Sequence, residues 1–432
     1  MENNFDNRQR KGKRQKIIIA VILALIVVIS FLGGYFVHYA VNGKNINTAV
    51  RILKIIEKVG FVYDERTGER REITEEEIAD ALVNAVLDDY ASYYTKSEYQ
   101  SVAEHGKGNY QGFGLTFFDA NLTVDRVTGN SPAFKAGIEI GDKIVYGKYG
   151  EKEKSFSKYS EMDNFLYNAP SDIDILLKVQ RANKELNFTV QKNAYTASYV
   201  TYFDSEEAYC FETDKNGKMV GKSYNGKGKS ELFDDVALIS FSAFEGGASN
   251  QMSLALERMK ERGRTKLILD LRGNGGGYMD VLTEVAGYLI YCNGKNNFTV
   301  AVSESKNNKE YFYSGKNKFN KDITSISVLA DKYSASASEC LIGAMLHYGG
   351  VFSADKLIIQ KDDDGKATTF GKGIMQTTYG FIDGSALKLT TARVLWPDET
   401  TCIHKKGITT KAENQVGASQ VISRALDVLS EI

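Results

Sequence analysis

Cysteine and histidine are scarce in this 432-residue chain, which contains four of each. The cysteines form no CxxC pair and no Cys/His set at zinc spacing, so a disulfide-dense scaffold and a zinc-finger framework are excluded. Lys and Arg number 54 against 55 Asp and Glu, so the basic excess of a protein that coats nucleic acid is missing. With 43% hydrophobic and 25% charged residues, the composition is that of a globular protein.

One long apolar run stands near the N-terminus. Residues 17–41 carry no charged side chain apart from His38, and six Lys and Arg residues precede them. An apolar run of about 20 residues spans a bilayer as a helix, and the basic side stays in the cytoplasm. We therefore expect a cytoplasmic tail (1–16), a single-pass anchor (17–41) and an extracytoplasmic remainder in a bacterial cell membrane. A cleaved signal peptide is the alternative, but the run is long and lacks an obvious small-x-small site.

Residues 42–105 are predicted to be mainly helical. Thr74 and Glu77 have the spacing of a capping box, in which the Thr caps a helix N-terminus. Apolar residues then recur on one helical face, at Ile78, Leu82, Ala85 and Val86. Short helices of this kind bury little alone, so we expect this face to pack on a neighbour.

Residues 106–195 have the pattern of a small β-rich domain, with short alternating runs broken by Gly and Asn. Leu122–Val127 and Asp174–Val179 are predicted strands. Ser131–Gly137 predicts a short helix with Pro at its start and Gly at its end.

Residues 196–432 alternate between strand and helix patterns, after an exposed loop or hairpin at 214–230. Such alternation implies crossover units and a largely parallel sheet, an α/β fold. The predicted strands are Val236–Phe241, Lys266–Leu271 and Ile326–Ala330, and the predicted helices lie around Met252–Met259, Val281–Tyr291, Cys340–His347 and Gln415–Leu429.

A glycine-rich turn follows the second of these strands. Residues 269–277 read Leu-Asp-Leu-Arg-Gly-Asn-Gly-Gly-Gly. Amides exposed where a strand turns into a helix are suited to holding an anion. A flexible connection is the plain alternative, and the phosphate-loop pattern is absent.

A Ser/Ala run, Ser334–Glu339, lies between a predicted strand and helix. A serine there can present its Oγ at a helix N-terminus, where a developing oxyanion is favoured. A simple helix N-cap is the alternative. No Gly-x-Ser-x-Gly elbow occurs, which disfavours an α/β-hydrolase.

A serine nucleophile needs a base, and the histidines of this chain are poorly placed to provide one. A buried lysine can serve, because desolvation disfavours its ammonium form. Lys372 is flanked by glycines and lies close to Phe370 and Ile374. Gln376, four residues on, lies on the same side in a helix or a strand and can orient the amine.

Taken in order, the glycine-rich turn, Ser-Ala-Ser-Ala-Ser-Glu and Thr-Phe-Gly-Lys-Gly-x-x-Gln resemble the carboxyl-terminal processing proteases, serine peptidases with a Ser/Lys dyad on a crotonase/ClpP-like fold. The resemblance extends over nearly the whole chain beyond residue 41. Residues 87–94 resemble the segment before the family's PDZ domain, and 112–115 with 131–144 resemble the PDZ domain itself. Residues 387–393 and 407–408 resemble the family's C-terminal strands.

The resemblance implies a role for each matching residue. Ser336 is the nucleophile, Lys372 the general base, and Gln376 orients the lysine. The oxyanion hole is formed by the amides of Gly276, rather than Gly277, and Ala337. No metal or organic cofactor is needed. Extra residues at 361–365 are expected to loop out at the surface, and Gly275 replaces the family's usual Pro.

In the PDZ domain, the amides of Phe113, Gly114 and Leu115 are implied to bind a substrate C-terminal carboxylate. The expected partners are proteins or peptides with free C-termini and the membrane, not nucleic acid. The sequence leaves the oligomeric state open, a homo-oligomer included. Two other functions compete: an inactive, membrane-tethered PDZ scaffold, and a crotonase-like acyl transferase. Loss of Ser336 or Lys372 would favour the scaffold, and neither is lost.

Overall fold

The computed structural model describes residue 71 and residues 73–182, 184–214, 218–223, 228–292, 297–314 and 321–431. The anchor expected at 17–41 lies outside these ranges. Among the residues that are described, no helix is both long and apolar enough to cross a membrane.

The C-terminal half is built on a mixed sheet. In the described chain its strand order is β12-β11-β10-β13-β14-β17-β18-β21, with parallel pairing from β13 to β21 and antiparallel pairing from β12 to β13. The sheet is therefore parallel in one part only. The strands are β10 (Val200–Phe203), β11 (Ala208–Thr213), β12 (Met219–Ser223), β13 (Val236–Phe241), β14 (Lys266–Asp270), β17 (Ser325–Ala330), β18 (Leu357–Gln360) and β21 (Gln415–Val416).

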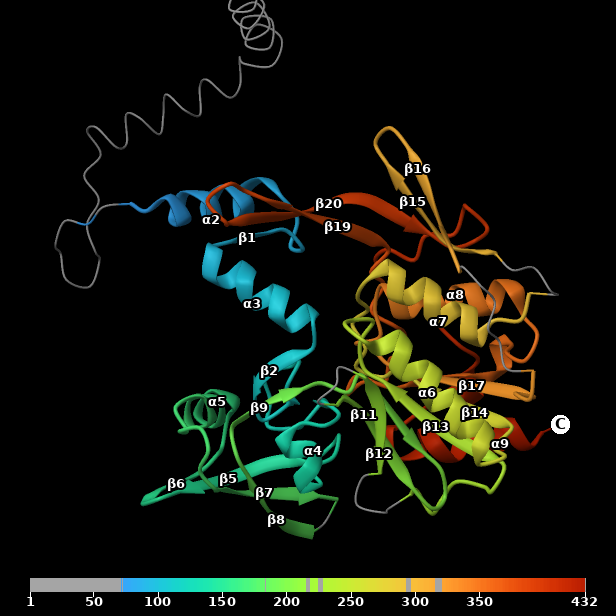
Figure 1. Cartoon of the computed structure of the whole chain (residues 1–432), viewed down its shortest axis with the longest axis horizontal. Helices are drawn as coiled ribbons and strands as arrows, with labels where there is room; N and C mark the ends of the chain where they lie inside the picture. The colour runs from blue at the N-terminus through green and yellow to red at the C-terminus, as the bar shows by residue number, and fades with distance from the viewer. Residues whose placement is uncertain are drawn as a thin grey trace, which may run out of the picture. The chain divides into compact units, whose positions relative to one another are not determined.

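Helices cover both faces of the parallel strands (Figure 1). Leu267 and Leu269 belong to the core on the face of α6 (Ala248–Glu261), α7 (Met279–Leu289) and α8 (Ala337–Tyr348). Ile268 belongs to the opposite core, with α9 (Val421–Ser430). Parallel strands buried on both faces are continuous apolar runs, which is why the sequence predicted β13 and β14 correctly.

A second sheet lies beside this layer. β20 (Ala386–Leu395) pairs with β1 (Ser92–Tyr94), β15 (Thr299–Ser305) and β19 (Ile374–Gly380), and β15 pairs with β16 (Lys309–Tyr313). Every pairing is antiparallel. The sheet thus holds a segment from before the β-rich domain and the strand that follows Lys372, with β20 paired to both.

The β-rich domain has a core of its own, formed by residues between Phe113 and Val190. Its main sheet has the order β6-β5-β7-β8, and β2 pairs with β9 where the chain enters and leaves the domain. Its elements are β2 (Asn109–Gly112), β3 (Leu115–Thr116), β4 (Arg126–Val127), α4 (Pro132–Ala136), β5 (Lys143–Tyr149), β6 (Lys152–Ser155), α5 (Tyr159–Tyr167), β7 (Ile175–Arg181), β8 (Lys184–Val190) and β9 (Asn193–Thr196).

The predicted short helix is confirmed as α4. Ser131 caps it by accepting a hydrogen bond from the Phe134 amide at 3.2 Å, and Pro132 is its first residue. Gly137 ends it at φ 91°, a left-handed conformation that suits glycine. The strand predicted over 122–127 is shorter, because only Arg126–Val127 forms a strand.

Four other expectations need correction. The capping box of Thr74 and Glu77 is present at the start of α2 (Glu75–Val86), but Leu82 and Val86 are exposed and only Val83 of this helix is buried. The helical stretch is also interrupted, because β1 precedes α3 (Lys96–Gly106). At the C-terminus, 415–416 form β21 and the helix begins only at Val421, and 407–408 are not in a strand.

Candidate active site

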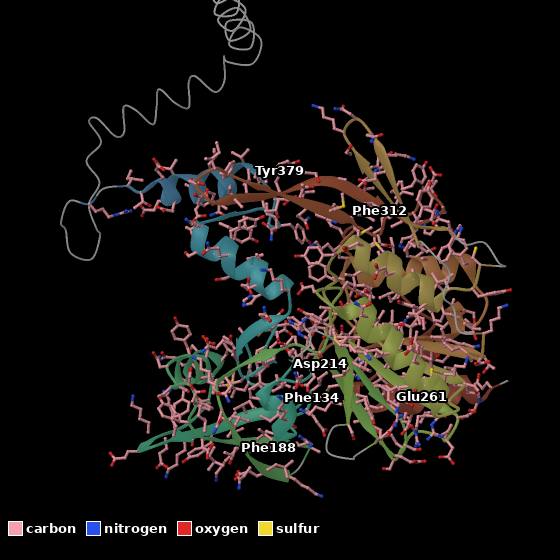
Figure 2. The ribbon with its side chains drawn as sticks, in the orientation of Figure 1. Phe134, Phe188, Asp214, Glu261, Phe312 and Tyr379 are labelled. Atoms are coloured by element: carbon pink, nitrogen blue, oxygen red, sulfur yellow. The ribbon has the colours of Figure 1, made fainter. Side chains whose placement is uncertain are left out.

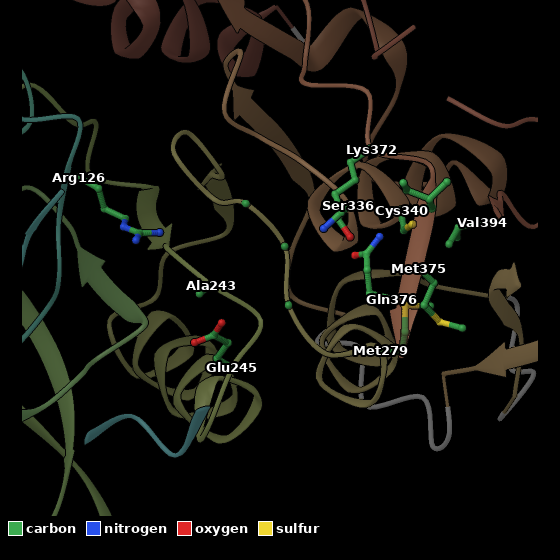
Figure 3. Close-up of a pocket in the computed structure, with 14 residues that line it drawn as sticks. Arg126, Ala243, Glu245, Met279, Ser336, Cys340, Lys372, Met375, Gln376 and Val394 are labelled. Atoms are coloured by element: carbon green, nitrogen blue, oxygen red, sulfur yellow. The ribbon is translucent and has the colours of Figure 1, made fainter. Parts of the chain in front are cut away.

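The residues predicted for catalysis meet at one cavity of about 340 Å³. Ser336, Lys372 and Gln376 line it together with the turn Gly275–Gly277. Figure 3 shows the side chains of Ser336, Lys372 and Gln376 pointing toward one another from different elements. The rest of the lining is partly apolar, from Ala243, Met279, Cys340, Ile374, Met375 and Val394, and partly charged, from Arg126 and Glu245.

Ser336 occupies the N-cap position of α8 with φ 56° and ψ −113°. A positive φ is unusual for serine and costs on the order of 1 kcal/mol or more, so the surroundings must enforce it. The preceding residue is held to the glycine-rich turn, since the Ala335 amide donates to the Asn274 carbonyl at 3.0 Å. The two interpretations of this serine, helix cap and cavity residue, therefore apply to the same position.

The glycine-rich turn approaches Ser336 more closely than a side chain would allow. A Cβ on Gly276 would lie 2.7 Å from the Ser336 Cβ and 2.9 Å from the Ala337 amide nitrogen. Gly276 also has φ 101°, so glycine is required here for two reasons. The amides of Gly276 and Ala337 are thus neighbours, but the Gly276 amide already donates to Asn274 Oδ1 at 2.9 Å.

Lys372 is half-buried, and its pKa is lowered first by this burial and then by the nearby charge of Lys388, with Asp88 acting in the opposite sense. Its Nζ lies 5.1 Å from the centre of the Tyr90 ring. Within the described chain, no hydrogen bond joins Lys372 Nζ to Ser336 or to Gln376. Gln376 donates through Nε2 to Thr390 Oγ1 at 3.0 Å instead. The predicted residues are gathered at one cavity, but Lys372 and Ser336 are not hydrogen-bonded to each other.

Glu339 was missed as a site residue, although the Ser-x-x-Glu spacing with Ser336 was a signal for a capping box. Its side chain is fully buried. Oε2 accepts from the Ser336 and Lys372 amides, each at 2.9 Å. Oε1 accepts from Thr369 Oγ1 at 2.5 Å and from the Gly371 amide at 2.8 Å. Burial raises the Glu339 pKa, while these donors lower it.

Arg126 and Glu245 were also missed, because nothing in the sequence connects them. Arg126 comes from β4 of the β-rich domain, and its Nη1 donates to the Gly273 carbonyl at 3.4 Å. Burial raises the Glu245 pKa, with Arg126 opposing the shift. The β-rich domain therefore contributes a charged residue to the wall of the cavity (Figure 3).

The loop Phe113–Leu115 is not part of the cavity lining. The Phe113 carbonyl accepts from Ala133, and the Gly114 carbonyl accepts from Thr128. In the described chain, the Phe113 and Gly114 amides donate no hydrogen bond. Phe113 packs into the domain core rather than lining an open pocket. Residues 361–365 form the expected surface turn, in which Gly365 donates to the Asp362 carbonyl at 3.0 Å.

Known proteins are similar to this chain over most of its length. A "Probable CtpA-like serine protease" of Staphylococcus saprophyticus is 27% identical over 416 residues, which is 93% of this chain and 74% of the relative. Its namesake in Staphylococcus aureus strain N315 is 27% identical over 412 residues, covering 94% and 74%. The family model "Peptidase family S41" matches residues 235–413. Residues 235–413 of the chain thus resemble peptidase family S41.

Among solved structures, the photosystem II D1 C-terminal processing protease is similar, with a TM-score of 0.47 and 18% identity over 85% of this chain and 86% of that one. The family model and the curated relatives support a serine-type peptidase. The residues matched by the family model, 235–413, include the glycine-rich turn, Ser336, the extra residues at 361–365 and Lys372. None of these matches is an acyl transferase, so they give no support to that alternative.

Proposed function

We propose that this chain is an S41-type peptidase that cleaves protein substrates near their C-termini, with Ser336 as nucleophile and Lys372 as general base. The observation that supports the proposal most is the convergence of Ser336, Lys372 and the glycine-rich turn on one cavity. Lys372 is half-buried with a lowered pKa, as a lysine that must be neutral to act as a base requires. Nothing favours the inactive-scaffold alternative, since both residues line the cavity.

The reaction has two halves. Neutral Lys372 accepts the Ser336 proton while Oγ bonds to the peptide carbonyl carbon, and the carbonyl oxygen becomes an oxyanion. The Lys372 ammonium then gives this proton to the leaving amine as the peptide bond breaks, which leaves an acyl-enzyme. Water repeats the sequence, releases the acid and restores Ser336.

Three local changes accompany this mechanism. Lys372 Nζ leaves the Tyr90 ring for Ser336 Oγ, and Gln376 exchanges Thr390 for the lysine amine. The Gly276 amide donates to the oxyanion in place of Asn274 Oδ1, and the Ala337 amide at the start of α8 donates to the oxyanion as well. Amides at a helix N-terminus have no partner within the helix, so Ala337 suits this role.

The β-rich domain, as a PDZ domain, selects the substrate in this proposal. The unpaired amides of Phe113 and Gly114 are available to a C-terminal carboxylate, with Leu115 beginning the strand that a peptide extends.

The expected anchor at 17–41 holds the enzyme on the outer face of the cell membrane. Protease added to cells stripped of their wall should then digest the domains after residue 41, and their protection would contradict this orientation.

Ser336→Ala tests the catalytic assignment. The variant should fold normally and lose all cleavage of a peptide with a free C-terminus, because it lacks the nucleophile. A serine-directed fluorophosphonate should label wild-type Ser336 and not the variant. Ser353→Ala, at an exposed site, is the control and should remain active. Cleavage by the Ser336→Ala protein at the wild-type rate would contradict the assignment, as would unimpaired cleavage by Lys372→Ala.

A further inference from the structure

The ring of Tyr90 is the nearest aromatic group to the amine of Lys372, in the part of the chain that is described. The distance from Nζ to the ring centre is 5.1 Å, within the range at which an ammonium is attracted to the face of an aromatic ring. Tyr90 lies far from Lys372 in the sequence, in the turn before β1. The contact therefore depends on the tertiary fold and not on local chain geometry.

Tyr90 is held in place from both sides. Its amide donates to Asp88 Oδ1 at 3.1 Å, and the Ala91 amide donates to the Asp88 carbonyl at 3.0 Å. Directly afterwards, β1 pairs with β20, which pairs in turn with β19. The turn with Tyr90 is thus fixed to the same sheet that continues from Lys372.

The charges around Lys372 come from several elements. Lys388 on β20 opposes its ammonium form, and Asp88 favours it. Glu339 on α8 accepts from the Lys372 backbone amide rather than from Nζ. Arg126 and Glu245 line the same cavity. In the described chain no carboxylate forms an ion pair with Nζ, so the ring is the group in direct contact with the cation.

We propose that the Tyr90 ring is the resting place of the Lys372 ammonium, so that Lys372 reaches Ser336 only after it loses its proton to solvent and leaves the ring. The attraction of an ammonium to an aromatic face is electrostatic, and a neutral amine does not share it. Protonation and position of Lys372 are therefore coupled. Tyr90 is a positioning residue in this scheme, and the inference rests on the proposed role of Lys372 as the base.

The protonation of Lys372 can be measured without any protease assay. Trace acetic anhydride acetylates only neutral amines, so its rate of reaction at Lys372, followed by peptide mass spectrometry across pH in the full-length protein, gives the pKa of that lysine. The remaining lysines serve as internal standards. Tyr90→Leu removes the ring, and Tyr90→Phe keeps it.

In Tyr90→Leu the Lys372 pKa should fall by about 0.5 to 1 pH unit, since the lost attraction had favoured the ammonium. The acidic limb of kcat/KM should move to lower pH by the same amount. Tyr90→Phe should match the wild type in both measurements. Tyr94→Leu is the matched control, because Tyr94 lies on β1 and faces Lys388 at 5.5 Å in the same way.

The outcomes separate the two proposals. An unchanged Lys372 pKa in Tyr90→Leu, or an equal fall in Tyr94→Leu, overturns the role of Tyr90 even if Ser336-dependent cleavage is intact. A fall of the Lys372 pKa in Tyr90→Leu alone supports the contact between the Tyr90 ring and the Lys372 ammonium. If the wild type then cleaves no peptide, the proposed function fails but this contact stands.

Discussion

The carboxylate of Glu339 accepts a hydrogen bond of 2.9 Å from the backbone amide of Lys372. The same oxygen accepts from the amide of Ser336 at 2.9 Å. One buried side chain thus connects the segment of the proposed nucleophile with that of the proposed base. Because Glu339 touches only backbone amides and Thr369 Oγ1, it positions the two residues and takes no part in proton transfer.

Glu339→Gln should impair catalysis and stability together. Each Glu339 oxygen faces two donors, so the amide group of Gln would confront two of them in either orientation. Leaving buried donors without an acceptor costs about 1–3 kcal/mol, which denaturant unfolding will detect, and kcat should fall more than KM changes. Glu413→Gln, at an exposed site, is the control. An active variant of normal stability would show that the connection is dispensable.

The cleavage rate should rise with pH as Lys372 loses its proton. Burial and Lys388 lower its pKa, so the acidic limb of kcat/KM should lie below the ordinary lysine value of about 10.5. Lys388→Gln removes a like charge and should move this limb to higher pH. The pKa of Lys372 is lower in the folded protein than in the unfolded chain. At a pH between these two values Lys372 is neutral in the folded protein and protonated in the unfolded chain, so the free energy of unfolding should increase with pH in that window. A pH-independent rate would exclude Lys372 as the base.

Two adjacent glycines should respond differently to the same change. Gly276→Ala places a Cβ within 3 Å of Ser336 and Ala337 and strains a φ of 101°, so cleavage should fall by at least about tenfold through displacement of the turn. Gly275→Ala meets nothing within 4 Å and has no positive φ. It should remain active and gain about 0.4–1 kcal/mol in stability, because the unfolded chain loses freedom. Equal effects of the two changes would contradict the close approach at Gly276.

The elements with strong local signals were predictable from the sequence. β13 and β14 are unbroken apolar runs, and α4 has Ser, Pro and Gly at the positions that start and end a helix. Ser336, Lys372 and Gly276 were found through short motifs, and the structure places all three at one cavity. Their chemical roles stay predictions.

The remaining site features depend on contacts between distant segments. Arg126 reaches Gly273 across the boundary of the β-rich domain, and Tyr90 reaches Lys372 through the pairing of β1 with β20. No local pattern encodes such contacts. The apolar face of α2 was predicted as buried, yet Leu82 and Val86 are exposed, since periodicity describes a helix and not the neighbour it needs. Figure 2 shows Tyr379 in the β19–β20 region of the second sheet, where its side chain is exposed as well.

Substrate selection by the β-rich domain depends on the loop Phe113–Leu115. Gly114 has φ 80°, and a Cβ there would lie 2.1 Å from the Ser131 Cβ, so only glycine allows this loop to hold its amides together. Gly114→Ala should therefore damage peptide binding while the Ser336 cavity, which contains no residue of this loop, keeps its shape. Fluorophosphonate labelling of Ser336 in the variant checks that the cavity is intact.

A peptide with a C-terminal acid should bind the inactive Ser336→Ala protein more tightly than its amide. The amide form lacks the charge that the Phe113 and Gly114 amides would bind, and loss of charge-assisted hydrogen bonds weakens binding by about 1–3 kcal/mol. Calorimetry with both peptides measures this difference, which Gly114→Ala should abolish.

Deleting residues 106–192 then separates two roles of the domain. A tether predicts slower cleavage at low substrate concentration, whereas a gate over the cavity predicts faster and less selective cleavage. Equal affinity for acid and amide would exclude both.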